Sequence, residues 1–296
     1  MTLVKMNYAG IPSFALAKVE DDRKLIEMWL HGKSGNTAAA YQKDIEGFQA
    51  FVGGKPFQQV TLNDMQDFAN ALSLKGYAVG TQRRKLNAVR SLLTYGHNLG
   101  VLAVNAGKPV ELPKGREALA QKILSEGEIL RLIHGFSGQQ RDRLLLKLLY
   151  ALGARVSEVC ALTWADCSER ADGGVTISIY GKGGKTRHVA VSGGIWDEIS
   201  SLRGVEPISS PIFKSRKGNA LTRQQVLRIV KKAADEAGID KPVSPHWFRH
   251  AHASHSLERG ASTALVQATL GHADPRTTMG YVHLNPEKSS GAFLAI

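Results

Sequence analysis

Cysteine is scarce in this chain of 296 residues, which contains only Cys160 and Cys167. Two cysteines without a paired spacing encode neither a disulfide framework nor a zinc site. Long apolar runs are also missing, and no stretch is long enough to cross a bilayer. The first residues, Met1 to Ser13, lack the pattern of a cleavable secretion signal. We therefore expect a soluble cytoplasmic protein without a metal and without contact to a membrane.

Acidic side chains are in deficit. The sequence has 26 aspartates and glutamates against 38 lysines and arginines, a formal charge of +12 at pH 7. A basic surface attracts and holds polyanions, nucleic acids above all. The hydrophobic fraction of 43% is ample for packed cores, and the length fits about two domains of roughly 150 residues. The composition favours a globular nucleic-acid-binding protein, although ribosomal association or a charge serving solubility would give similar counts.

Residues 1–106 have the apolar periodicity of helices throughout, and we expect a compact helical bundle there. The predicted helices span residues 21–30, 36–51, 61–74 and 81–99. The last of them places Arg83, Arg84 and Lys85 on its polar side. These three residues are the best candidates for phosphate contacts in this domain, and an ordinary solvated helix face explains them equally well.

Residues 107–122 change in character and are expected to form an interdomain linker, because prolines and mixed charges replace the apolar periodicity. A second domain, residues 123–296, opens with Ser125 and Glu128 in a capping-box pattern. A strongly apolar helix over residues 141–152 is expected at the centre of its core. Gly153 ends that helix, and Arg155 then begins another, where backbone amides favour an anion.

Two alternating segments, residues 175–180 and 187–191, predict a β-hairpin with a basic, glycine-rich tip. The tip, Gly-Lys-Gly-Gly-Lys-Thr, is followed by a strand. A nucleotide-binding loop would be followed by a helix, so we exclude an ATP site. Lys182 on such a tip can instead reach into a groove and donate a proton. The fold is therefore expected to be mainly α with a small β-hairpin or sheet, an α+β protein whose second domain is mixed but mostly helical.

Residues 244–284 contain the side chains that are best suited to catalysis. His246 and Arg249 are three residues apart and share one face of a predicted helix. A turn further on would bring His272 and Tyr281 back towards them. Arginine offers a planar fork for phosphate oxygens, histidine exchanges a proton near neutral pH, and tyrosine can attack phosphorus. Together these groups suit a phosphodiester substrate.

The motifs, in this order and context, resemble those of the tyrosine recombinases, the phage integrase family, and most of all its Xer-type site-specific members. The resemblance covers nearly the whole chain. It rests on Arg-Val-Ser-Glu-Val, Gly-Lys-Gly-Gly-Lys-Thr-Arg, His-Trp-Phe-Arg-His, Leu-Gly-His and Thr-Thr-Met-Gly-Tyr-Val-His. The catalytic residues that it implies are Arg155, Lys182, His246, Arg249, His272 and the nucleophile Tyr281.

The resemblance implies a site-specific recombinase that cleaves and rejoins DNA. Tyr281 would attack the scissile phosphate and form a 3′-phosphotyrosyl bond, releasing a 5′-hydroxyl. The two arginines would clamp the non-bridging oxygens, and Lys182 would protonate the leaving oxygen. His246 would handle the tyrosine proton, and His272 would bind the phosphate or orient its neighbours. ATP is not required, since the covalent bond keeps the energy of the phosphodiester, and the resemblance implies no metal either.

The implied partner is double-stranded DNA at specific sites, in a nucleoid-associated assembly. The chain would act with copies of itself, as a tetramer on two DNA sites, or with a related recombinase. Further DNA contacts are expected from six basic residues. They are Arg83, Arg84, Lys85, Lys185, Arg187 and Arg223.

Three other functions agree with part of the sequence. A type IB topoisomerase uses similar tyrosine chemistry to relax DNA, but that group usually has lysine where His246 stands. An architectural DNA-binding protein with dead catalytic residues disagrees with the intact set of motifs. A metal hydrolase could use the histidines of residues 246–255, but the glutamate of a His-Glu-x-x-His site is absent.

Overall fold

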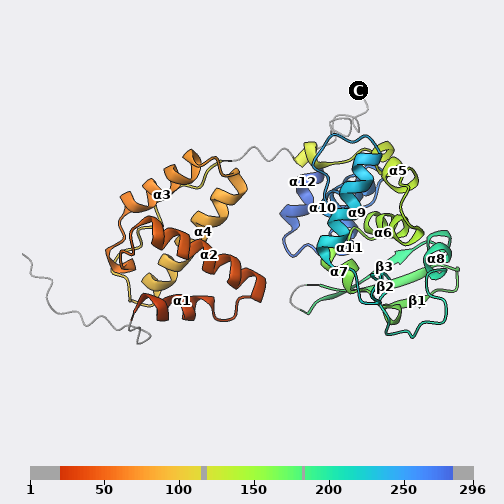
Figure 1. Ribbon diagram of the computed structural model, residues 1–296, viewed down its shortest axis with the longest axis horizontal. Helices are drawn as coiled ribbons and strands as arrows, with labels where there is room; N and C mark the ends of the chain where they lie inside the picture. The colour runs from red at the N-terminus through yellow and green to blue at the C-terminus, as the bar shows by residue number, and fades with distance from the viewer. Residues whose placement is uncertain (1–20, 115–118, 182–183, 283–296) are drawn as a thin grey trace, which may run out of the picture. The chain divides into compact units, whose positions relative to one another are not determined.

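The computed structural model describes residues 21–114, 119–181 and 184–282. By its contacts the chain divides into two compact units, Met1–Glu117 and Ala118–Ile296. Figure 1 shows one unit built from α1–α4 and another that contains the remaining helices and the strands.

The first unit is a bundle of helices, and the four predicted helices are confirmed. Its elements are α1 (Asp22–Leu30), α2 (Gly35–Phe51), η1 (Phe57–Gln59), α3 (Leu62–Leu74) and α4 (Val79–Asn98). Local sequence explains where α3 begins. The Thr61 side chain accepts from the Asp64 amide, and the Asp64 carboxylate accepts from the Thr61 amide. Helices α2 and α4 pack against each other around a core that includes Ile45, Phe48 and Leu86.

The predicted linker, residues 107–122, is packed near both of its ends. Val110 is buried in the core of the first unit, and Leu112 packs against the same core. At its other end, η2 (Leu119–Lys122) begins the second unit, where Leu119 packs against the small core cluster that includes Tyr281.

The second unit is mostly helical and carries one small sheet, which confirms the predicted α+β class. Its helices are α5 (Glu126–His134), α6 (Gln140–Leu152), α7 (Val156–Ala161), η3 (Trp164–Asp166), α8 (Gly193–Ser200), α9 (Arg223–Glu236), α10 (Pro245–Glu258), α11 (Thr263–Leu270) and α12 (Pro275–Val282). Its strands are β1 (Cys167–Glu169), β2 (Val175–Tyr180) and β3 (Thr186–Val191). The capping box of Ser125 and Glu128 is present at the start of α5.

The sheet is antiparallel, with the strand order β1-β2-β3. The predicted hairpin is confirmed, with Val175 opposite Val191 and Tyr180 opposite Thr186. Strand β1 and helix α8 were not predicted. A three-residue strand is too short to show alternation, so only its pairing with β2 reveals it.

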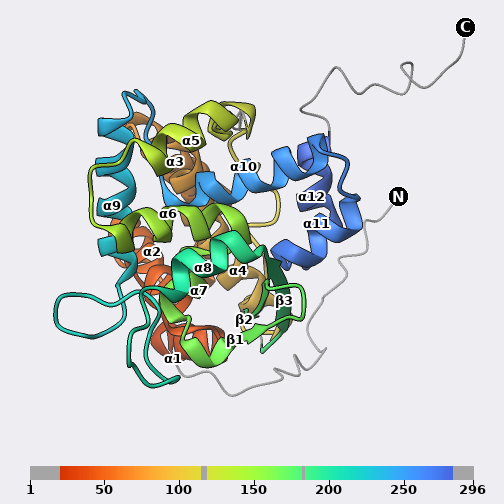
Figure 2. The same ribbon diagram turned by 90° about the vertical axis from the view of Figure 1, so that its right-hand side faces the viewer.

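Helices α6 and α10 form the centre of the second unit. The leucines of α6 are almost completely buried, as predicted, and α10 packs against α6 on one side and against α11 and α12 on the other (Figure 2). Gly153 ends α6 at φ 55°, a left-handed conformation that favours glycine. A Cβ atom there would lie 2.7 Å from the side chains of His252 and Leu270, so the chain turns tightly between the three helices. In the described ranges, no helix combines the length and apolar character needed to span a membrane.

Candidate active site

Arg249 lies at the centre of the site and is only 1% exposed. Its Nη1 donates to the Gly153 carbonyl at 2.8 Å, and its Nη2 donates to the Leu270 carbonyl at 2.7 Å. The Gly153 carbonyl belongs to the left-handed glycine that ends α6. The Leu270 carbonyl belongs to the last residue of α11, directly before the left-handed Gly271. Burial, followed by the charge of Arg155, lowers the pKa of Arg249 to about 10, so the guanidinium is charged at neutral pH. The helix ends therefore fix a buried positive charge in one orientation.

Arg155 precedes α7 and is held by Glu158, a residue that our sequence analysis did not assign. The Glu158 carboxylate accepts from Arg155 Nη1 at 2.8 Å and from the Arg155 backbone amide at 2.8 Å. It also accepts from Arg187 Nη2 at 2.6 Å. Burial alone would raise the pKa of Glu158, but the hydrogen bonds from Arg187 and Arg155 hold it below its ordinary value. One ionised carboxylate thus orients two arginines. Its position three residues after Arg155, where capping carboxylates occur, was the available signal.

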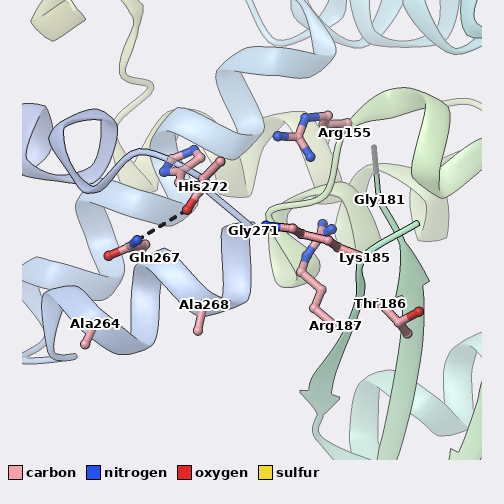
Figure 3. Close-up of a pocket in the computed structure, with 11 residues that line it drawn as sticks. Arg155, Gly181, Lys185, Thr186, Arg187, Ala264, Gln267, Ala268, Gly271 and His272 are labelled. Carbon is pink, nitrogen blue, oxygen red and sulfur yellow. Dashed lines mark hydrogen bonds between the residues drawn. The ribbon is translucent and has the colours of Figure 1, made fainter. Parts of the chain in front are cut away.

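A cavity of about 570 Å³ opens beside these arginines. Figure 3 shows Arg155, Lys185 and Arg187 on one side of it, and Ala264, Gln267 and Ala268 of α11 on the other. The Arg187 side chain is only 11% exposed, and its Nε donates to the Thr269 carbonyl at 2.7 Å. Arg187, expected as a DNA contact, is therefore part of the wall of the cavity.

His272 enters the cavity from the turn after α11. Its Nδ1 lies 2.8 Å from the hydroxyl of Thr278, which is fully buried. Burial, followed by the charges of Arg249 and Arg155, lowers the pKa of His272 to about 4. The imidazole is therefore neutral near pH 7, and Thr278 sets the orientation of its ring.

Tyr281 lies near the end of α12, and its side chain is buried at 5% exposure. Its hydroxyl oxygen lies 2.6 Å from Nδ1 of His250. The His250 ring in turn packs against the exposed His246 ring, with centroids 4.4 Å apart and planes at 63°. Burial raises the pKa of Tyr281 above its ordinary value, and the charge of Arg249 offsets only part of that rise. The resemblance implies that His246 handles the tyrosine proton, whereas the imidazole that the hydroxyl contacts in the structure is His250.

The structure thus gathers five of the six predicted catalytic residues around α10 and the turns beside it. They are Arg155, His246, Arg249, His272 and Tyr281. The sixth, Lys182, lies outside the described residues.

The remaining predicted DNA contacts lie on other elements. Arg84 forms an ion pair with Asp44, which is 1% exposed, and Lys85 Nζ lies 3.4 Å from the same carboxylate. Arg83 is exposed on α4, and Arg223 is exposed at the first turn of α9. Part of the basic run on α4 is therefore occupied by an internal ion pair.

The other histidines of α10 do not gather around a common point. His252 Nδ1 lies 2.8 Å from the Tyr150 carbonyl, and His255 Nδ1 lies 2.9 Å from the Tyr150 hydroxyl. Within the described part of the chain, no group of three or more His, Cys, Asp or Glu side chains could hold a metal ion. The geometry gives no support to the metal hydrolase reading.

Comparisons with known proteins agree with this arrangement. Residues 122–288 match the model of the phage integrase family, and residues 26–97 match the phage integrase N-terminal SAM-like domain. A tyrosine recombinase XerC from Thermodesulfovibrio yellowstonii is 32% identical, over 86% of this chain and 87% of the relative. A tyrosine recombinase XerD from Vibrio cholerae is 33% identical, over 90% of this chain and 94% of the relative.

Solved structures show the same fold. The XerH site-specific recombinase, bound to its difH substrate, has a TM-score of 0.71 at 20% identity, covering 95% of this chain and 98% of XerH. A lambda integrase tetramer on a Holliday junction has a TM-score of 0.69 at 17% identity, covering 86% of this chain and 77% of the integrase.

Proposed function

Because the chain belongs to the phage integrase family, we propose that Tyr281 is the nucleophile with which this enzyme cleaves and rejoins DNA. The protein is a tyrosine recombinase, and its reaction is site-specific DNA recombination. The observation that carries the proposal is the position of the Tyr281 hydroxyl against α10, the helix that also holds His246 and Arg249. A phenol beside a buried guanidinium and two imidazoles is suited to attack on a phosphodiester.

Charge around the site favours a phosphate group. Arg155 and Arg187 share the Glu158 carboxylate, and Arg249 adds a third guanidinium that Glu158 also influences, so a net positive charge remains among these four groups. Arg249 uses two of its five N–H groups on carbonyl oxygens, which leaves others for the non-bridging oxygens of DNA. Donors fixed in place before the reaction stabilise the charge that builds up in the transition state.

The chemistry that we assign begins with attack of the Tyr281 oxygen on the scissile phosphorus. A 3′-phosphotyrosyl bond forms, and the 5′-oxygen leaves as a hydroxyl after protonation. Lys182 is our candidate for that proton, on the strength of the hairpin motif alone. We assign no step to ATP, because the phosphotyrosine bond keeps the free energy needed to rejoin the strands, and we assign none to a metal ion.

Double-stranded DNA is the proposed partner, and four copies of the chain on two DNA sites are the proposed assembly. The support is the fold shared with XerH on its difH substrate and with the lambda integrase tetramer on a Holliday junction. The exposed basic residues Arg83 and Arg223 remain candidates for contacts with the DNA backbone.

The first experiment uses a nicked suicide substrate, on which a cleaved strand diffuses away and the covalent complex accumulates. The wild-type protein is expected to form such complexes, and Tyr281→Phe is expected to form none while still binding DNA. Covalent complexes from Tyr281→Phe would contradict the assignment of the nucleophile.

A second experiment separates the acid from the clamp. A 5′-bridging phosphorothiolate leaves without protonation, so it should restore cleavage by Lys182→Ala. It should not restore cleavage by Arg155→Ala to a similar extent, because that arginine acts on the non-bridging oxygens. Equal rescue of both variants would remove Lys182 from the role of the acid.

A further inference from the structure

His250 is in direct contact with the proposed nucleophile. Its Nδ1 atom lies 2.6 Å from the Tyr281 hydroxyl oxygen, within the range of a short hydrogen bond. The Tyr281 ring packs among Ala253, Val266 and Leu270, so its position is set by apolar contacts on α10 and α11. The same packing keeps the hydroxyl beside His250, one residue after Arg249 on α10.

The protonation state of His250 decides how this hydrogen bond can be used. Burial, followed by His246, Lys122 and Arg249, lowers the pKa of His250 to about 4. A neutral imidazole has one ring nitrogen without a proton, and a phenol below its pKa has a proton to give. With the imidazole proton on Nε2, the Tyr281 hydroxyl donates to Nδ1 of His250, and its lone pairs remain available to phosphorus. The same relation of hydroxyl to imidazole activates nucleophiles in many enzymes.

We propose that His250 accepts the Tyr281 proton as Tyr281 attacks the scissile phosphate, an inference that rests on the proposed function of Tyr281. The bond from the tyrosine oxygen to phosphorus forms, and the bond from phosphorus to the 5′-oxygen breaks with its electron pair. The phenolic proton moves to Nδ1 of His250, and the 5′-oxygen takes a proton from the general acid. When the strands are rejoined, His250 returns its proton to Tyr281.

The proton transfer accompanies attack and does not precede it. Full transfer from a phenol to an imidazole with a depressed pKa is unfavourable in the resting protein. As the tyrosine oxygen bonds to phosphorus, it becomes far more acidic, and the nearby imidazole then receives the proton. The phosphate brings negative charge next to the new imidazolium and offsets the repulsion from Arg249.

The test compares His250→Asn with His255→Asn. Asparagine places an amide close to the position of Nδ1 and can accept the hydrogen bond, but it cannot take up a proton. His255 is the matched control, because it pairs with Tyr150 at 2.9 Å on the other half of the same helix. His250→Asn is expected to slow formation of the covalent complex about 10²- to 10³-fold. Its affinity for an intact DNA site should stay unchanged, and His255→Asn should cleave at the wild-type rate.

A fluorinated tyrosine at position 281 distinguishes proton transfer from positioning. The fluorinated phenol is more acidic and depends less on a base, so it should raise the cleavage rate of the His250→Asn variant at least tenfold. Slow cleavage without that rescue would mean that His250 only positions Tyr281, and it would overturn the inference. Wild-type cleavage by His250→Asn would overturn it as well. In both cases an inactive Tyr281→Phe variant would leave the proposed function in place.

Discussion

Each half of α10 carries a histidine that is hydrogen-bonded to a tyrosine of another helix, and the two hydrogen bonds are similar in length. In the first half, His250 Nδ1 lies 2.6 Å from the Tyr281 hydroxyl. In the second half, His255 Nδ1 lies 2.9 Å from the Tyr150 hydroxyl. Burial lowers the pKa of both histidines and raises the pKa of both tyrosines.

The surroundings of the two pairs differ in charge. Arg249 acts on Tyr281 and, with His246, on His250. Around Tyr150 the charges are mixed, because Arg259 is accompanied by the carboxylates of Glu126 and Glu258. A phosphate is attracted to the first pair, and carboxylates would repel it from the second. A tyrosine bonded to a histidine is therefore not in itself an active site, and the charge around it decides its chemistry.

The largest expected difference between the two halves comes from their arginines. Arg249→Ala leaves the carbonyl oxygens of Gly153 and Leu270 without their donors inside the core. The free energy of unfolding should fall by about 3 kcal/mol, and covalent complexes should not form. Arg259 is 68% exposed in its ion pair with Glu126, so Arg259→Ala should cost less than about 1 kcal/mol. Urea unfolding and the suicide substrate measure both effects, and similar losses in the two variants would break the contrast.

The two tyrosines should separate stability from chemistry. Tyr150→Phe and Tyr281→Phe each remove one hydroxyl from a hydrogen bond with histidine, at a cost of about 1 kcal/mol in unfolding free energy. Only Tyr281→Phe should abolish covalent complex formation, while Tyr150→Phe should cleave within about twofold of the wild type. A strong loss of cleavage in Tyr150→Phe at unchanged stability would mean that the second pair also takes part in the reaction.

A smaller difference in cleavage is expected between variants of the two carboxylates Glu158 and Glu258. Glu158→Gln gives Arg155 and Arg187 a neutral partner, so both guanidinium groups lose a fixed position. Misplacement of a clamping group should slow cleavage about tenfold to a hundredfold. Glu258 is exposed and accepts from Ser254 at 2.8 Å, and Glu258→Gln should change cleavage less than about twofold. Single-turnover cleavage rates at saturating protein measure the effect. Equal rates for Glu158→Gln and Glu258→Gln would refute the expected difference.

The smallest expected effect is in the pH dependence of stability. The pKa of His250 is lowered from 6.5 to about 4 in the folded protein. Between these values the unfolded chain binds more protons, so the free energy of unfolding falls as the pH is lowered from 6.5 towards 4. His255 has a lowered pKa too, but the carboxylates of Glu258 and Glu126 act against that shift. His250→Asn should therefore reduce the loss of melting temperature on acidification more than His255→Asn does. Identical acid dependence in both variants would contradict the difference in their surroundings.

Features that depend on neighbours in sequence were predictable. The capping box of Ser125 with Glu128 joins two residues that are three positions apart, and it marks the start of α5 in the structure. The hairpin of β2 and β3 followed from alternation with a short turn. Helix α8 was missed, although it directly follows the predicted strand β3.

Features that join distant residues were not predictable in the same way. Arg187 and Glu158 are separated by 29 positions, and His250 and Tyr281 by 31. The first pair joins β3 to α7, and the second depends on the packing of α12 against α10. The resemblance implied Tyr281 as the nucleophile and His246 as the residue that handles its proton, whereas the packing of the helices places its hydroxyl beside His250.

The order of the residues, read alone, specifies an α+β protein, the family to which it belongs and a set of candidate catalytic residues. The fold class follows from local periodicity and capping, which depend on side chains within a few positions of one another. The family and the candidate catalytic residues follow from the resemblance of the motifs to those of the tyrosine recombinases. The tertiary fold assigns partners to those side chains. It places Glu158 between two arginines, directs Arg249 to the carbonyl groups of two helix ends, and sets His250 against Tyr281. Such contacts depend on how helices pack and how charges lose water, and neither is encoded in a local pattern.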